Sequence, residues 1–96
     1  MKSIIETFIT TLLKDKGKKI KCSDCSRITG KVIKYRLENY NVDILNTATV
    51  ISDDTMSDKI YIDLINVLDI AHYEYPISID FGLTYKDKYI SITIYK

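Results

Sequence analysis

The spacing of apolar residues changes once along the chain, directly after Gly17. Before Gly17, apolar side chains recur three and four residues apart and form one stripe, which is typical of an amphipathic helix. Ser3 and Glu6 have the spacing of a capping box, and Gly17 stands where a left-handed residue would end the helix. After Gly17 apolar and polar residues alternate, as in a half-buried strand. The sequence therefore predicts a helix over residues 3–16 and a first strand over residues 18–22.

Two further alternating segments, residues 28–37 and 40–45, predict a hairpin that turns at residues 38–39. A two-residue loop sets Leu37 opposite Tyr40 and keeps the large apolar side chains of both segments on one face. A register shifted by one residue would set them against polar residues. We therefore expect these two segments to pair, with residues 46–52 prolonging the second of them.

The C-terminal part predicts a second hairpin over residues 77–95. Pairing Leu83 with Ile90 and Phe81 with Ile92 places all four side chains on one face and leaves Lys86 and Asp87 at the tip.

The middle of the chain is more ambiguous. Residues 59–71 fit an alternating strand or a helix, and the β-branched residues at 60–62 favour a strand, a brief turn near Asn66 and another short strand. Residues 52–58 predict a polar loop.

The composition is that of a globular chain. Of the 96 residues, 46% are hydrophobic and 28% charged, which is too apolar for a disordered segment and short enough for one domain. We expect an α+β fold: an amphipathic helix packed on a strongly bent, mainly antiparallel sheet or small open barrel, with an added C-terminal hairpin. Its parts would be the helix (3–16), a β-rich body (18–71) and the hairpin (77–95). The N-terminus has neither the pattern of a signal peptide nor the length to span a bilayer, so we expect a cytoplasmic protein without a membrane partner.

Charge is divided unevenly along the chain. Residues 1–36 hold ten Lys and Arg against three acids, whereas the remainder holds four Lys against ten acids. This asymmetry indicates a basic surface for phosphate, an acidic partner or another copy of the chain, unless folding interleaves the two halves. The candidate phosphate contacts are Lys18, Lys19, Lys21, Arg27, Lys31, Lys34 and Arg36.

The two cysteines, Cys22 and Cys25, lie three positions apart. A structural zinc site needs four ligands, and His72 is the one histidine that could add a third. A redox pair would need a helix after the first thiol, yet the following residues read as strand. The third interpretation is that both are structural thiols at a strand end. We expect no bound cofactor and no catalytic residues, because the sequence has no nucleophile elbow and no Gly-rich phosphate loop.

The segment GKVIKYRLENYNVDIL (residues 30–45), preceded by a helix and followed by IYIDLINVLDI (residues 60–70), resembles the element order of Sm-like small β-barrel proteins over residues 3–71. That resemblance implies ring assembly by strand-edge pairing, RNA binding and a bend of the second strand at Gly30. It also implies that Tyr40 stacks on a base and Asn41 hydrogen-bonds it.

The match to the Sm-like RNA-binding motifs is partial. The family's aspartate falls at Leu37, and its Arg-Gly pair is replaced by Asp63-Leu64. A carboxylate at that place would repel phosphate.

The functional hypotheses are non-enzymatic. The first is a small interaction module that self-associates or joins a larger assembly, with strand edges and the tyrosines Tyr35, Tyr40 or Tyr61 as contacts and nucleic acid as one candidate ligand. The second is a regulator encoded by a phage or mobile element that binds and occludes a host protein. The third is a zinc-stabilised domain using Cys22 and Cys25.

Overall fold

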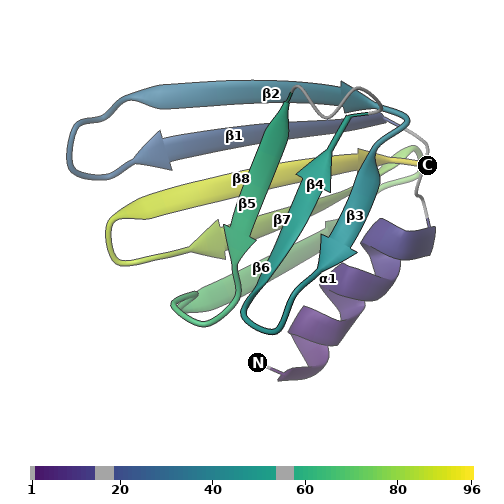
Figure 1. The fold of residues 1–96 in the computed structure, drawn as a ribbon, viewed down its shortest axis with the longest axis horizontal. Helices are drawn as coiled ribbons and strands as arrows, with labels where there is room; N and C mark the ends of the chain where they lie inside the picture. Colours follow the sequence, from purple (N-terminus) through teal and green to yellow (C-terminus); the bar gives the residue numbers. More distant parts are fainter. Residues whose placement is uncertain (1, 15–18, 54–57) are drawn as a thin grey trace.

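The computed structural model describes residues 2–14, 19–53 and 58–96 and contains one helix and eight strands (Figure 1). The elements are α1 (Lys2–Lys14), β1 (Lys19–Ser26), β2 (Val32–Glu38), β3 (Asn41–Ile44), β4 (Ala48–Ser52), β5 (Lys59–Asp63), β6 (Asp69–Glu74), β7 (Ser78–Thr84) and β8 (Lys88–Tyr95). The chain is thus mostly β with one small helix, which agrees with the α+β prediction. The predicted helix end and Lys18 lie outside the described residues, as does most of the predicted polar loop.

The strands form two antiparallel sheets. The larger sheet has the order β2-β1-β8-β7-β6, and the smaller sheet has the order β3-β4-β5. Figure 1 shows the smaller sheet and α1 side by side on the same face of the larger sheet. We call that covered face of the larger sheet its inner face and the opposite one its outer face.

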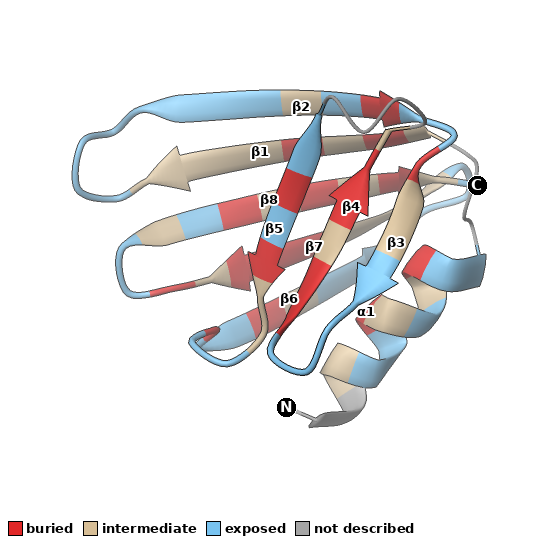
Figure 2. Ribbon diagram, in the orientation of Figure 1, coloured by how far each residue is buried: buried red, intermediate tan, exposed pale blue. Residues whose placement is uncertain are grey.

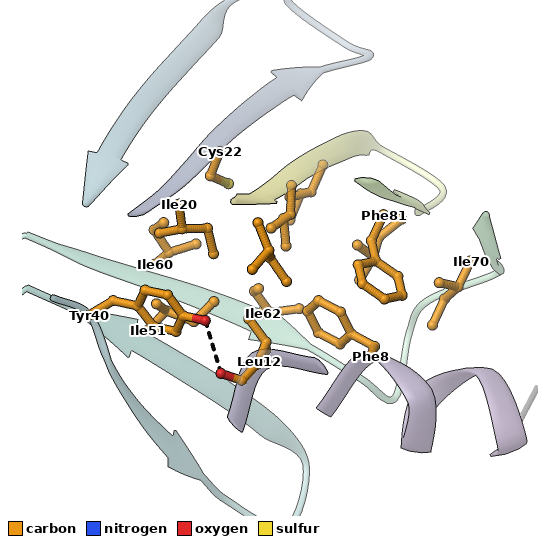
Figure 3. Packing of buried hydrophobic residues seen from close by; sticks show 14 of the residues in the cluster. Phe8, Leu12, Ile20, Cys22, Tyr40, Ile51, Ile60, Ile62, Ile70 and Phe81 are labelled. Carbon is orange, nitrogen blue, oxygen red and sulfur yellow. Dashed lines mark hydrogen bonds between the residues drawn. The ribbon is translucent and has the colours of Figure 1, made fainter. Parts of the chain in front are cut away.

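The core lies between these layers and explains why the strands alternate in burial (Figure 2). From α1, Phe8 and Leu12 are fully buried, and the ring of Phe8 meets that of Phe81 edge-on at 5.0 Å between centroids. All five strands of the larger sheet contribute to the core, with three isoleucines from β8, and the smaller sheet contributes Ile51, Ile60 and Ile62 (Figure 3). The apolar stripe of the helix therefore closes the part of the core beside β3.

The C-terminal hairpin has the predicted register. In the pairing of β7 with β8, Leu83 lies opposite Ile90 and Phe81 lies opposite Ile92, and all four are buried. The prediction of strand, turn and strand over residues 59–71 is also confirmed, as β5 and β6.

The predicted hairpin between residues 28–37 and 40–45 is wrong. β2 pairs with β1, and β3 pairs with β4 in the other sheet. Asn39, with φ of 50°, turns the chain from one sheet into the other. Leu37 and Tyr40 are both buried, as the alternation requires, but Leu37 enters the shared core from β2 and Tyr40 enters it from the connection just before β3.

Several boundaries also differ from the sequence prediction: β1 continues to Ser26, beyond the predicted end at residue 22, and β2 begins at Val32, four residues after the predicted start. Residues 48–52 form β4, a separate strand antiparallel to β3, and do not prolong that strand. Gly30, with φ of 74°, lies in the turn between β1 and β2, so it forms a hairpin turn and does not bend a strand. Glycine suits this turn because side chains disfavour positive φ.

The helix begins at Lys2, one residue before the predicted start, so Ser3 lies inside it. The side chain of Ser3 is outside the described part of the chain. Within residues 2–14, 19–53 and 58–96, no helix is long and apolar enough to cross a membrane.

Candidate functional site

The outer face of the larger sheet is not covered by any other element of the described chain (Figure 1). Because side chains alternate along a strand, the partners of the core residues point outward here. Lys34 and Arg36 on β2 flank the inward-facing Tyr35, and Lys21 and Ser23 on β1 flank the buried Cys22. The outer face therefore carries the polar side chains that alternate with the apolar core residues along each strand.

The strand register brings positive charge together on β1 and β2. Lys21 lies directly opposite Arg36, and Lys34 lies opposite Ser23 on the next row. Like charges opposite each other on one face destabilise a sheet, so this pair lowers stability unless an anion neutralises it. Lys19 lies opposite Glu38, so the unbalanced positive charge centres on Lys21, Lys34 and Arg36. We call these three residues the basic cluster.

A pocket of about 230 Å³ opens beside the basic cluster. The register explains its shape, because Ser23 pairs with Ser91 and Lys21 pairs with Thr93, which leaves small hydroxyl side chains as a floor between longer cations. No carboxylate lines it. The outward-facing residues at the pocket are Lys21, Ser23, Lys34, Arg36, Ser91 and Thr93. Ammonium, guanidinium and hydroxyl groups are the donors that bind phosphate oxygens.

The floor of this pocket continues across the sheet as a row of small residues. Ser23 pairs with Ser91, Ser91 with Gly82, and Gly82 with Ala71. The phenol of Tyr89 lies over Gly82, so closely that a side-chain carbon at Gly82 would collide with the Tyr89 hydroxyl. Glycine is therefore required for the Tyr89 hydroxyl to approach β7 this closely.

Aromatic side chains border the row of small residues. Tyr89 is partly exposed, and Tyr73 on β6 is more exposed. The Nζ atoms of Lys19 and Lys21 on β1 lie 5.4 and 5.7 Å from the centroid of the Tyr95 ring on β8, so both ammonium groups are held over that ring by cation–π attraction. The outer face thus combines fixed cations with accessible rings.

The structure places the other predicted phosphate contacts away from this pocket. Arg27 and Lys31 lie at the turn between β1 and β2, where the Arg27 guanidinium donates a hydrogen bond of 3.2 Å to the Tyr85 carbonyl. The Arg27 amide also donates a hydrogen bond to the Asp87 carbonyl. Arg27 therefore joins the turn between β1 and β2 to the tip of the C-terminal hairpin. Arg27 therefore has a structural role, and Lys18 lies outside the described residues.

Tyr40 is a core residue and not a base-stacking platform, which corrects the expectation from the Sm-like resemblance. Its ring is fully buried, and its hydroxyl donates a hydrogen bond of 2.9 Å to the Leu12 carbonyl of the helix (Figure 3). Asn41 begins β3 in the smaller sheet, on another layer from the basic cluster. Of the other two tyrosines considered, Tyr35 is half-buried on the inner face and Tyr61 is exposed on β5.

The three proposed zinc ligands are separated. Cys22 faces the core and Cys25, an odd number of residues further along β1, faces outward. His72 lies on β6, three strands from β1 or roughly 14 Å away, and its ring stacks on Phe81 at 4.8 Å. Burial, assisted by the nearby Asp24 carboxylate, raises the pKa of the Cys22 thiol to about 12. Cys22 is therefore a protonated core thiol and a poor metal ligand or redox group.

A second pocket, of about 350 Å³, lies between the turn after β5 and the tip of the C-terminal hairpin. Its charges alternate in sign, with Asp63 and Asp87 beside Lys86 and Lys88. Asp63 accepts hydrogen bonds from the side chain of Asn66 and from two backbone amides, and these bonds lower the pKa of its carboxyl group. The Asp63 carboxylate therefore stabilises the turn in which it lies. Because acidic and basic side chains both line the pocket, it favours neither an anionic nor a cationic ligand.

Sequence reasoning found the cations of the outer-face pocket and missed its hydroxyl floor. Ser91 and Thr93 are more than fifty positions from Lys34 and Arg36, so no local motif joins them. The alternation of the last strand does predict that Ser91 and Thr93 point away from the core. It does not predict that β8 pairs with β1. Comparison of the chain with protein-family models, curated proteins and solved structures finds no match.

Proposed function

We propose that this chain is a non-enzymatic binding module that holds single-stranded nucleic acid on the outer face of its larger sheet. The observation that carries the proposal is the basic cluster: Lys21 and Arg36 face each other directly, Lys34 lies beside them, and no carboxylate lines their pocket. Sequences that fold well avoid such conflicts except where function requires them. A phosphate in the pocket would relieve the repulsion and accept hydrogen bonds from Ser23, Ser91 and Thr93.

The shape of the face favours a single strand. The broad face of a five-stranded sheet does not enter a groove of a duplex, whereas unpaired bases can stack on rings exposed on a sheet. Tyr89 lies one strand and Tyr73 three strands from Lys21 in the sheet order, so the backbone would follow β1 and β2 while bases extend toward β7 and β6. The affinity would come mainly from phosphate contacts and would be strongly salt-dependent.

The test is fluorescence anisotropy with a labelled thymine oligomer of about 15 nucleotides, titrated at several salt concentrations. For three phosphate contacts, the logarithm of the association constant should fall with the logarithm of salt concentration with a slope of about −2. Replacing the basic cluster by glutamine, as K21Q/K34Q/R36Q, should bring that slope close to zero.

The matched control is K14Q/K59Q/K86Q, which removes the same charge from exposed lysines on α1, β5 and the C-terminal hairpin tip. It should keep most of the slope. The proposal fails if the wild-type chain does not bind at low salt, or if the two triple variants lose the same slope. Self-association through a strand edge, for which β2 is one edge of the larger sheet, stays a prediction.

A further inference from the structure

The floor of the outer-face pocket is short and is closed at both ends. Ser23 and Ser91 pair across β1 and β8, and their small side chains form this floor. On the β2 side, the long side chain of Lys34 lies opposite Ser23. On the β7 side, the residue opposite Ser91 is Gly82, and the Tyr89 hydroxyl occupies the space over it. The floor therefore spans two strands and ends at an ammonium group on one side and at a phenol on the other.

The cations reach this floor from two sides. Lys34 and Arg36 lie on β2, the edge strand, and Arg36 belongs to the next row, which continues through Lys21 to Thr93. The Nζ atom of Lys21 lies 5.7 Å from the centroid of the Tyr95 ring on β8, so this ammonium group is held toward β8 and away from β2. An anion in the pocket therefore meets hydroxyl donors below it and positive charge on two sides.

A phosphate at the end of a strand matches this arrangement better than an internal phosphate. An internal phosphodiester has two free oxygens and one negative charge, and sugars leave it in two directions. A terminal phosphate monoester has three free oxygens and carries about −1.5 to −2 charges at pH 7. Its three oxygens can meet the floor and both cationic sides together, and its single sugar can leave through the open side of the pocket.

We propose that the outer-face pocket binds the terminal phosphate of a single strand, and that the chain thereby selects strands that end in a phosphate monoester. This inference rests on the proposed binding of single strands and adds end selection to it. The second charge of the monoester offsets more of the repulsion between Lys21 and Arg36 than a diester does. Internal phosphates meet the same cations with fewer contacts, so a strand that ends in hydroxyl groups still binds.

The experiment compares three thymine oligomers of about 15 nucleotides, which carry a 5′ phosphate, a 3′ phosphate or neither. The fluorophore is placed on the end away from the phosphate, and the oligomer with two hydroxyl ends is prepared with either label position. The wild-type chain should bind at least one phosphorylated oligomer about ten-fold more tightly at pH 7.5, since one further charge-assisted hydrogen bond contributes about that factor. The end that gives the preference is the end that enters the pocket.

The pH dependence separates a monoester from a diester. The second proton of a phosphate monoester binds with a pKa of about 6, so the ten-fold preference should fall to about two-fold at pH 5. In the described part of the chain, no histidine or carboxylate lines the pocket. The carboxylates in neighbouring positions of the outer face are Glu38, opposite Lys19, and Asp80, opposite Thr93. Binding of the oligomer with hydroxyl ends at both pH values corrects for any change in these two groups.

The floor variant is Ser91→Ala with Thr93→Val, which removes two hydroxyls and keeps the three cations. It should reduce the preference for a terminal phosphate to about three-fold or less. Ser78→Ala with Thr84→Val is the matched control, because these two residues are on the outer face of β7 and are not among the residues that line the pocket. It should keep the preference. Thermal unfolding checks that both variants fold, and Ser91→Ala alone replaces the floor variant if the double substitution does not fold.

Equal binding of all three oligomers by the wild-type chain, with the salt slope intact, overturns end selection alone. A preference that is unchanged at pH 5, or that survives in full in the floor variant, also overturns it. Absence of binding to every oligomer overturns the proposed function as well.

Discussion

The hydrogen bond from Tyr40 to Leu12 joins the helix to the segment that enters the smaller sheet, and its removal has a predictable cost. Tyr40→Phe keeps the ring and the buried area and deletes only the hydroxyl that donates to the Leu12 carbonyl at 2.9 Å. Both residues are fully buried, so water cannot replace the donor. A net hydrogen bond contributes roughly 0.5–1.5 kcal/mol, and a buried acceptor left short of a donor costs about 1–3 kcal/mol. We expect the free energy of unfolding to fall by about 1–2 kcal/mol.

The assay is urea unfolding followed by circular dichroism, together with a thermal scan. In a chain of this size, that loss should lower the midpoint temperature by roughly 5–15 °C. The matched control is Tyr61→Phe, since the Tyr61 ring is 59% exposed on β5 and its hydroxyl has access to water. Its effect should stay within about 0.5 kcal/mol. If both variants unfold together with the wild-type chain, the contact between helix and smaller sheet does not have the geometry described above.

Two other predictions concern single groups. At pH 8 a thiol reagent should label Cys25, which is partly exposed, and leave Cys22 unreacted, because burial raises the pKa of Cys22 to about 12; equal labelling of Cys25→Ser and wild-type protein would contradict this. The stability contributed by Asp63 should be fully present above its ordinary pKa near 3.8 and should be lost as the pH falls through its lower folded-state pKa, because the carboxylate accepts hydrogen bonds from Asn66 and from two backbone amides. Asp63→Asn should therefore flatten the pH dependence of the urea midpoint below pH 4, and an unchanged pH profile in that variant would count against this turn.

Alternation predicted most of the buried side chains of the C-terminal hairpin, but Ile33, Ile44 and Ile77 are exposed, and alternation did not predict which strands pair. For the C-terminal hairpin, the burial pattern also determines the pairing, since a short tip joins β7 to β8 and fixes the register. For β2 and β3, the burial pattern does not determine the pairing. Leu37 and Tyr40 both had to face apolar surroundings, and a hairpin and a two-sheet core satisfy that requirement equally well. The choice between them depends on the pairing of β2 with β1 across the turn at residues 27–31, and on the long-range pairing of β1 with β8.

The same limit applied to the candidate site. Basic residues in the first third of the sequence indicated a phosphate-binding surface, and the structure brings Lys21, Lys34 and Arg36 of that set together. The hydroxyl side chains of Ser91 and Thr93 come from β8, which joins β1 only through sheet order. Tyr40 shows the opposite failure, because its position in a family-like pattern suggested an exposed ring, whereas the alternation around it already required burial.

The most direct measurement of the central claim is an NMR titration of the labelled chain with the thymine oligomer. If the outer face of the larger sheet binds single strands, backbone amide shifts should move at Lys21, Lys34 and Thr93 and their neighbours, while those of β3, β4 and β5 stay in place. Shifts confined to the smaller sheet, or none at low salt, would contradict the account.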